Sequence, residues 1–227
     1  MSFLDDLPFL LEQILNGLLD GARYLLLALG LSLIFSLGGV VNLAHGAFYA
    51  IGAYLTVEIA AYAGFPGALI GVPLLVAALG VVIERLFLRR FYEQDPVLSL
   101  LFTFGLAMIA EQSLRMIFGA APRSFSIPPF LDGVFMFGEF LYPRYRAALI
   151  LLAIAAVAGM WFLLNRTSFG KIVKAGVAEP DMVRVVGISL TPILTATAAL
   201  GIGLAGLAGV IVAPIVSIHP AMGNEII

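Results

Sequence analysis

The sequence contains no cysteine and few charged residues, and each shortage excludes a class of protein. Without cysteine there is no disulfide framework and no thiolate metal site. Charged residues make up 11% of the chain, whereas soluble domains carry about 25%. The formal net charge is −2 and no basic stripe is present, so a nucleic-acid partner is not indicated. With 62% hydrophobic residues, the sequence predicts an all-α polytopic integral membrane protein.

The sequence also lacks the patterns of a catalytic or metal site. It contains no GxxxxGKS/T phosphate-binding loop and no Ser/His/Asp arrangement in a suitable context. Its two histidines, His45 and His219, have no other metal-ligating residues at suitable spacing. We therefore predict that the chain is not an enzyme and has no metal site.

A long stretch without Asp, Glu, Lys or Arg, residues 24–57, determines how the first helices are divided. As one straight helix its 34 residues would reach about 50 Å, well beyond the roughly 30 Å of a bilayer's hydrocarbon. Two full spans need about 40 residues, which are found if the second helix continues toward residue 65. The sequence therefore predicts a discontinuous helix with its break near residues 42–46.

Glycine and proline residues divide the apolar sequence into spans, because both end helices. They predict about six spans in a single transmembrane domain, residues 1–227, with approximate bounds 21–37, 43–63, 67–88, 96–118, 147–164 and 187–213. Pro192 lies near the start of the last span and removes a backbone donor. We expect it to kink that helix.

Three segments outside these spans have distinct compositions. Residues 1–20 place apolar side chains at helical spacing opposite polar ones, which predicts either an interfacial helix or an extension of the first span. Residues 119–146 contain four prolines and read as an ordered loop, with room for a small hairpin. Residues 165–187 are too polar for the bilayer and too apolar for a free linker. They predict a short surface helix that is presented to a soluble partner.

The basic residues indicate which side of the membrane each loop faces, because cytoplasmic loops retain Lys and Arg. Seven of the twelve basic residues lie in the loops after the third and fifth spans. Both loops are therefore predicted to be cytoplasmic, including the segment 165–187. Loop 119–146 is then predicted to be external.

Small residues stand four apart along the last span and form one continuous stripe. Such a stripe lets another helix backbone approach closely within lipid. It predicts a helix-packing face toward helices of this chain or of another subunit. The stripe consists of Thr197, Gly201, Ala205, Gly209 and Ala213, with Gly201, Ala205 and Gly209 at its centre.

Polar residues share one face of the second span, at spacings of three and four. Polar groups inside a membrane are costly unless they face a cavity or the bundle interior. This face is therefore the candidate lining of a substrate pathway, with Asn42, His45, Tyr49 and Thr56 as its residues. The alternative is that Asn42 acts as an N-cap and that, with His45, it only satisfies the broken backbone at the helix start.

Five segments together resemble one family of membrane proteins. They are VNLAHGAFYAIGAY, IERLFLRRF, DPVLSLLFTFGLAMI, TSFGKIVKAGVAEPDMVRVVGI and LAGLAGVIVAPIVSIHPAMG. In this order they resemble the permease subunits of branched-chain amino acid ABC importers, although NLAHG alone also suits amide and urea permeases. The resemblance implies a bacterial inner-membrane, multi-pass subunit on the translocation path. It implies four kinds of partner, namely a second permease subunit, two cytoplasmic ATPase subunits, an external substrate-binding protein and membrane lipid.

The resemblance also implies roles for particular segments. A cytoplasmic coupling helix that docks on the ATPase would lie within residues 175–187, with Ala175, Glu179, Asp181, Arg184 and Gly187 as its candidate residues. ATP and Mg²⁺ would bind in the partner ATPases, so no cofactor is expected in this chain. The C-terminal helices of the family would follow Gly223 and lie beyond this sequence. Alternatives to branched-chain amino acid import are a urea or short-amide permease and an ATP-independent membrane channel or structural protein.

Overall fold

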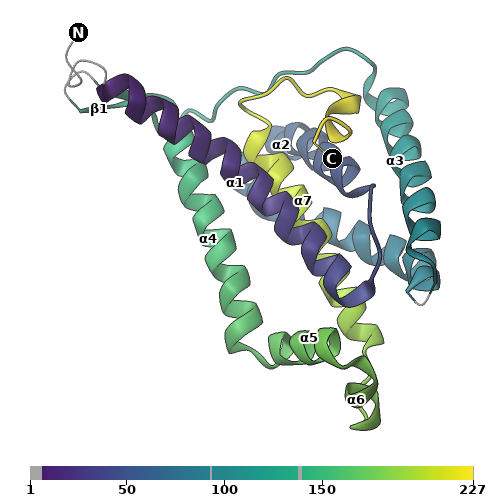
Figure 1. The fold of residues 1–227 in the computed structure, drawn as a ribbon. Coiled ribbons are helices and arrows are strands. Elements are labelled where there is room, and N and C mark those ends of the chain that lie inside the picture. The colour runs from purple at the N-terminus through teal and green to yellow at the C-terminus, as the bar shows by residue number, and fades with distance from the viewer. Residues whose placement is uncertain (1–6, 93, 138–139, 227) are drawn as a thin grey trace.

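The computed structural model describes residues 7–92, 94–137 and 140–226, and it is mostly helical (Figure 1). The described residues include five helices that are long and apolar enough to cross a membrane: α1 (Leu7–Gly38), α2 (His45–Leu86), α3 (Pro96–Phe118), α4 (Arg144–Arg166) and α7 (Thr191–Val212). The predicted class, an all-α polytopic membrane protein, is confirmed. Residues 1–6 of the predicted N-terminal helix, residues 138–139 of the predicted loop and residue 227 lie outside the described residues.

Helix α2 contains two membrane spans. At 42 residues it would measure about 63 Å if it were straight, twice the thickness of the hydrocarbon. Gly64 interrupts it with φ 67° and ψ 174°, a conformation that only glycine adopts without strain. The break at this glycine lies at the predicted division between the second and third spans, so the five helices are long enough for six spans.

The break before α2 lies where the long uncharged stretch requires one. Helix α1 ends at Gly38, and Gly39 follows with φ 64°. The backbone stays non-helical until His45, which begins α2. This agrees with the predicted discontinuity. At its other end, α1 runs without interruption from Leu7, so the described part of the N-terminal segment continues into the first span.

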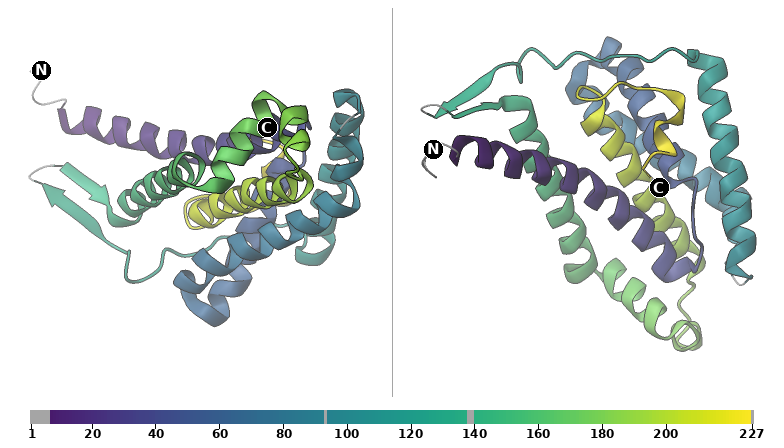
Figure 2. Two further views of the ribbon diagram at one scale, coloured as in Figure 1. Left: turned by 90° about the horizontal axis from the view of Figure 1, so that it is seen from below. Right: turned by 45° about the horizontal axis from the view of Figure 1, so that its top comes forward.

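Helix α7 forms the centre of the molecule (Figures 1 and 2). Its most extensive contacts are with α2 and then with α1, and most of its residues are buried. Helix α4 packs on the outer side of α1, and α3 contacts α2 at the opposite edge. The polar face of α2 is therefore placed against the small residues of α7.

The start of α7 differs from the prediction in one respect. The helix begins at Thr191 rather than near residue 187, so Pro192 lies in its first turn. Proline is favoured there because the first N–H groups of a helix have no intrahelical acceptor, and its fixed φ suits the helix. The prediction that Pro192 kinks this helix was therefore wrong.

The shorter elements lie at opposite ends of the molecule (Figure 1). At one end, β1 (Val134–Phe137) and β2 (Phe140–Pro143) pair antiparallel within the predicted loop. At the other end, α5 (Ser168–Ala178) and α6 (Pro180–Val185) connect α4 to α7. Two short 3-10 helices complete the described elements, η1 (Leu88–Phe91) after α2 and η2 (Pro220–Gly223) after α7.

Candidate transport path and coupling surface

Asn42 lies in the break between α1 and α2 and stabilises the start of α2. Its side chain is buried, and its Oδ1 accepts a hydrogen bond from the Ala44 N–H at 3.1 Å. Its carbonyl oxygen accepts from the His45 N–H at 3.2 Å. These bonds satisfy donors that the first turn of a helix leaves free. Ala44 rather than Asn42 occupies the N-cap position, so the N-cap role of Asn42 was wrong, although its side chain does satisfy a backbone donor of the break. Its contact with substrate stays a prediction.

Thr103 of α3 holds the same break from the other side. Its hydroxyl accepts a hydrogen bond from the Leu43 N–H at 3.1 Å and lies 3.1 Å from the carbonyl oxygen of Val41. One buried side chain therefore satisfies two backbone groups that no helix satisfies. Sequence reasoning missed this residue. The signal was the buried face of α3, where the small residues Ser99, Thr103 and Ala107 stand four apart in an apolar span.

His45 is buried where α1 and α7 approach closely at Gly30 and Gly201. A Cβ atom added to Gly30 of α1 would lie 2.5 Å from the carbonyl oxygen of Gly201 and 3.0 Å from Nε2 of His45. Glycine is therefore required at position 30 if the two helices and the imidazole are to share this space. His45 fills the junction between three helices, and its contact with substrate stays a prediction.

The remaining polar face of α2 packs on α7. The Thr56 hydroxyl donates to the carbonyl oxygen of Gly52 at 2.7 Å, so this buried group is satisfied within its own helix. A Cβ atom on Gly52 would lie 2.6 Å from the carbonyl oxygen of Gly206. On α7, Gly209 lies against the backbone of α2 and Gly201 against that of α1, while Ala205 is fully buried between them. The stripe of small residues therefore packs on two helices of this chain.

Tyr49 differs from its neighbours because it borders a cavity. The residue is 2% exposed, and with α1 and the segment after α7 it lines a volume of about 170 Å³. Arg23, His219 and Glu225 provide charged or titratable groups on the same walls. The predicted pathway residues thus separate into three that are enclosed by helices and one that faces a polar cavity.

A buried polar network lies at the opposite end of the molecule. Glu84 of α2 is fully buried, and its Oε2 accepts a hydrogen bond from the Thr195 hydroxyl of α7 at 2.7 Å. Its Oε1 accepts from the Tyr92 hydroxyl at 3.1 Å and lies 3.5 Å from Nε of Arg89. Burial and the charge of Glu84 raise the pKa of Tyr92, so its phenol keeps the donated proton. A buried carboxylate needs such partners.

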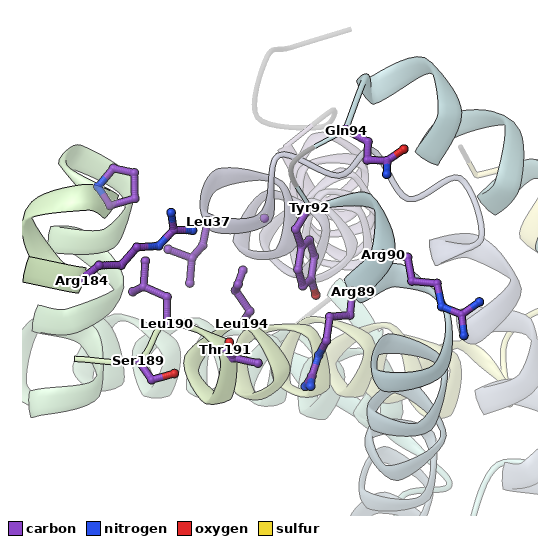
Figure 3. Close-up of a pocket in the computed structure, with 12 residues that line it drawn as sticks. Leu37, Arg89, Arg90, Tyr92, Gln94, Arg184, Ser189, Leu190, Thr191 and Leu194 are labelled. Carbon is purple, nitrogen blue, oxygen red and sulfur yellow. The ribbon is translucent and has the colours of Figure 1, made fainter. Parts of the chain in front are cut away.

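A large cavity separates this network from α6. It measures about 830 Å³. Figure 3 shows Tyr92 and Arg89 on one side and Arg184 of α6 on the other, with Leu190 and Leu194 between them. Glu84 lies within the predicted third span, residues 67–88, and Arg89 directly follows it, but no sequence pattern pairs them with other residues. Thr195 and Tyr92 were missed because neither forms a local pattern with Glu84.

Helices α5 and α6 form a separate surface beyond the spans. The Thr167 hydroxyl caps α5 by accepting from the Gly170 N–H at 3.2 Å. The inner face of α5 meets the core where Gly176 packs closely against Leu37 of α1 and Leu190. All of the predicted coupling residues are exposed: Ala175, Glu179, Asp181, Arg184 and Gly187. Exposed apolar side chains surround them, namely Val177, Met182, Val185, Val186 and Ile188.

Comparison with known proteins shows the family of this chain. A family model described as "Branched-chain amino acid transport system / permease component" matches residues 13–227. The chain belongs to this family. As a permease component it is a transport subunit rather than an enzyme, and it is a multi-pass membrane protein.

Relatives of the permease come from bacteria and an archaeon. The permease protein BraD of Pseudomonas aeruginosa is 25% identical over 88% of this chain and 70% of its own length. The Escherichia coli permease protein LivH is 23% identical over 89% of this chain and 70% of its own length. Both are described as high-affinity branched-chain amino acid transport system permease proteins. A probable branched-chain amino acid transport permease protein LivH of Methanocaldococcus jannaschii is 26% identical over 95% of this chain and 70% of its own length. No solved structure matches the permease.

Proposed function

We propose that this chain is a permease subunit of an ATP-driven importer and forms part of the translocation path for branched-chain amino acids. Membership of the permease family supports this role. The proposal that ATP drives the import is supported by the α5–α6 surface. This surface lies beyond the spans and exposes both charged and apolar residues. An exposed apolar patch with a charged surround is typical of a protein interaction site.

The contacts of α5 support a mechanism for the coupling. An ATPase subunit docked on α5 and α6 would push on Gly176, which lies against Leu37 of α1 and Leu190 before α7. Because both helices pack on the polar face of α2, a displacement at α5 would reach the break near Asn42. The proposed partners are two cytoplasmic ATPases that bind ATP and Mg²⁺, a second permease subunit and an external binding protein. The proposed location is the bacterial inner membrane.

Docking on α5 and α6 is tested by charge reversal on the proposed surface. The variant carries Glu179→Lys, Asp181→Lys and Arg184→Glu, and pull-down of the ATPase subunits is compared with that of the wild-type chain. Asp132→Lys, an exposed acidic residue beside the hairpin, is the control. We expect the triple variant to lose the ATPase and the control to retain it. Equal capture by all three chains, or by none, would contradict the coupling role.

Uptake by the reconstituted transporter separates the alternatives. We expect leucine uptake that requires ATP and that isoleucine and valine, but not urea, inhibit by competition. Urea or short-amide uptake without leucine uptake would identify the second class of permease. Leucine flux that continues without ATP would identify a channel.

A further inference from the structure

We propose that the 170 Å³ cavity beside Tyr49 is a binding site for an aliphatic amino acid in its zwitterionic form. This inference rests on the proposed function and assigns the substrate contact to particular residues. The cavity lies between α1, the polar face of α2 and the segment after α7. Its walls carry a positive group, a negative group and an apolar surface, which are the three features that such a ligand needs.

Arg23 of α1 supplies the positive group. Its guanidinium is held by Asp20, with Nη2 3.3 Å from Oδ1, and by stacking 4.9 Å over the ring of Tyr24. Its Nε atom is buried and has no hydrogen-bond partner among the residues that the structure describes. An unsatisfied buried donor is costly, and a charged side chain within a spanning helix is costly as well. A ligand carboxylate in the cavity would pair with the accessible part of the guanidinium, whose side chain is 19% exposed, and would offset the cost of this charge. Tyr49 lines the same cavity.

Glu225 supplies the negative group. Its Oε2 lies 3.5 Å from Nε2 of His219, and both residues line the cavity. Arg23, Tyr49 and Glu225 all line this cavity, so both charges border the same volume. A carboxylate at Arg23 would therefore leave the ammonium group of the same ligand toward Glu225.

The remaining walls favour an aliphatic side chain. Val216, Met222 and Ile226 are apolar and line the same cavity. Its volume of 170 Å³ corresponds to about five or six water molecules at roughly 30 Å³ each. That volume suits a single small amino acid and is below the roughly 300 Å³ at which sites for larger ligands begin.

The absence of cysteine from the chain allows a direct test of occupancy. Ser217 lines the cavity and is exposed, so Ser217→Cys introduces a single thiol at this site that a water-soluble maleimide can label. We expect leucine to slow the labelling at least threefold in the assembled transporter. Leucinamide, which lacks the carboxylate, and 4-methylpentanoate, which lacks the ammonium, should protect less. When Arg23→Gln is added to Ser217→Cys, leucine should protect the thiol no better than leucinamide does. When Glu225→Gln is added instead, leucine should protect it no better than 4-methylpentanoate does.

Matched variants make each result decisive. Ser126→Cys, exposed in the loop after α3 and outside the cavity lining, should be labelled at the same rate with and without leucine. Arg144→Gln at the start of α4 should leave both preferences unchanged. Unchanged labelling at position 217 in a transporter that takes up leucine would overturn the cavity assignment and leave the proposed function standing. A wild-type transporter without leucine uptake would overturn the proposed function and this assignment together.

Discussion

At the scale of single residues, two buried threonines of the permease show that position decides what a hydroxyl contributes. Thr103 and Thr56 are both fully buried within spanning helices. The Thr56 hydroxyl donates to Gly52 in its own helix, whose carbonyl oxygen is already within the helical ladder. The Thr103 hydroxyl accepts from Leu43, 60 residues away, in a segment without helical bonds. Only Thr103 therefore connects two elements.

We predict that Thr103→Val lowers the free energy of unfolding by about 1–3 kcal/mol, because the Leu43 N–H and the Val41 carbonyl lose their partner. Thr56→Val removes only an additional bond within one helix and should change stability by less than about 1 kcal/mol. Unfolding of the purified permease in detergent measures both values. Thr103→Ser, which keeps the hydroxyl, should restore most of the loss. Equal losses for the two valine variants would contradict the connecting role of Thr103.

At the scale of helices, the sequence predicted local features well and distant pairings poorly. The ends of the spans at Gly39 and Gly64 were predictable, because a glycine acts on the dihedral angles of its own position and both have a positive φ. The spacing of small residues along α7 likewise indicated a packing face. It could not indicate that Gly201 meets α1 whereas Gly209 meets α2. The bond between Glu84 and Thr195 joins residues 111 positions apart, and no local pattern marks such a pair.

The packing of α7 on α2 leaves no space for a methyl group at Gly209. A Cβ atom there would lie 2.3 Å from the Tyr49 carbonyl oxygen and 2.7 Å from the Ala53 nitrogen, and backbone atoms cannot rotate aside. We predict that Gly209→Ala lowers the free energy of unfolding by about 1–3 kcal/mol or more. Gly105→Ala on α3 is the control because no atom lies within 4 Å of its Cβ position. It should be neutral or stabilising by up to about 1 kcal/mol. Melting temperatures in detergent that fall equally for both would contradict this packing.

At the scale of the whole molecule, α7 links two chemically different ends. At one end, Arg123 in the loop after α3 exchanges backbone hydrogen bonds with Ile218, both at 2.8 Å, and its guanidinium reaches Glu58 of α2 at 3.0 Å. At the other end, the hydrogen bond from Thr195 to Glu84 connects the start of α7 to the end of α2, beside the cavity that faces α6. A movement of α5 and α6 would therefore reach the opposite end through α7 and its contacts with α2.

The Glu84 network provides a way to separate docking of the ATPase from transmission of its movement. We predict that Thr195→Val lowers the free energy of unfolding by about 1–3 kcal/mol, because Oε2 of the buried Glu84 loses the hydroxyl that donates to it. Glu84→Ala should lower it by a similar amount, because the Tyr92 hydroxyl loses its acceptor, whereas the Thr195 hydroxyl keeps a bond to the Thr191 carbonyl oxygen. The double variant should lose less than the sum, because the second change removes the group that the first left unpaired. Unfolding of the four chains in detergent measures this coupling.

The same variants have a functional outcome that follows from where the network lies. Glu84 is buried away from the exposed residues of α5 and α6, so Glu84→Ala should retain the ATPase in a pull-down. Leucine uptake should nevertheless fall severalfold, because α2 and α7 no longer move as one body at this end. Loss of ATPase capture would show that the network shapes the docking surface itself. Additive stability losses with normal uptake would contradict transmission of the movement through the contact between Glu84 and Thr195.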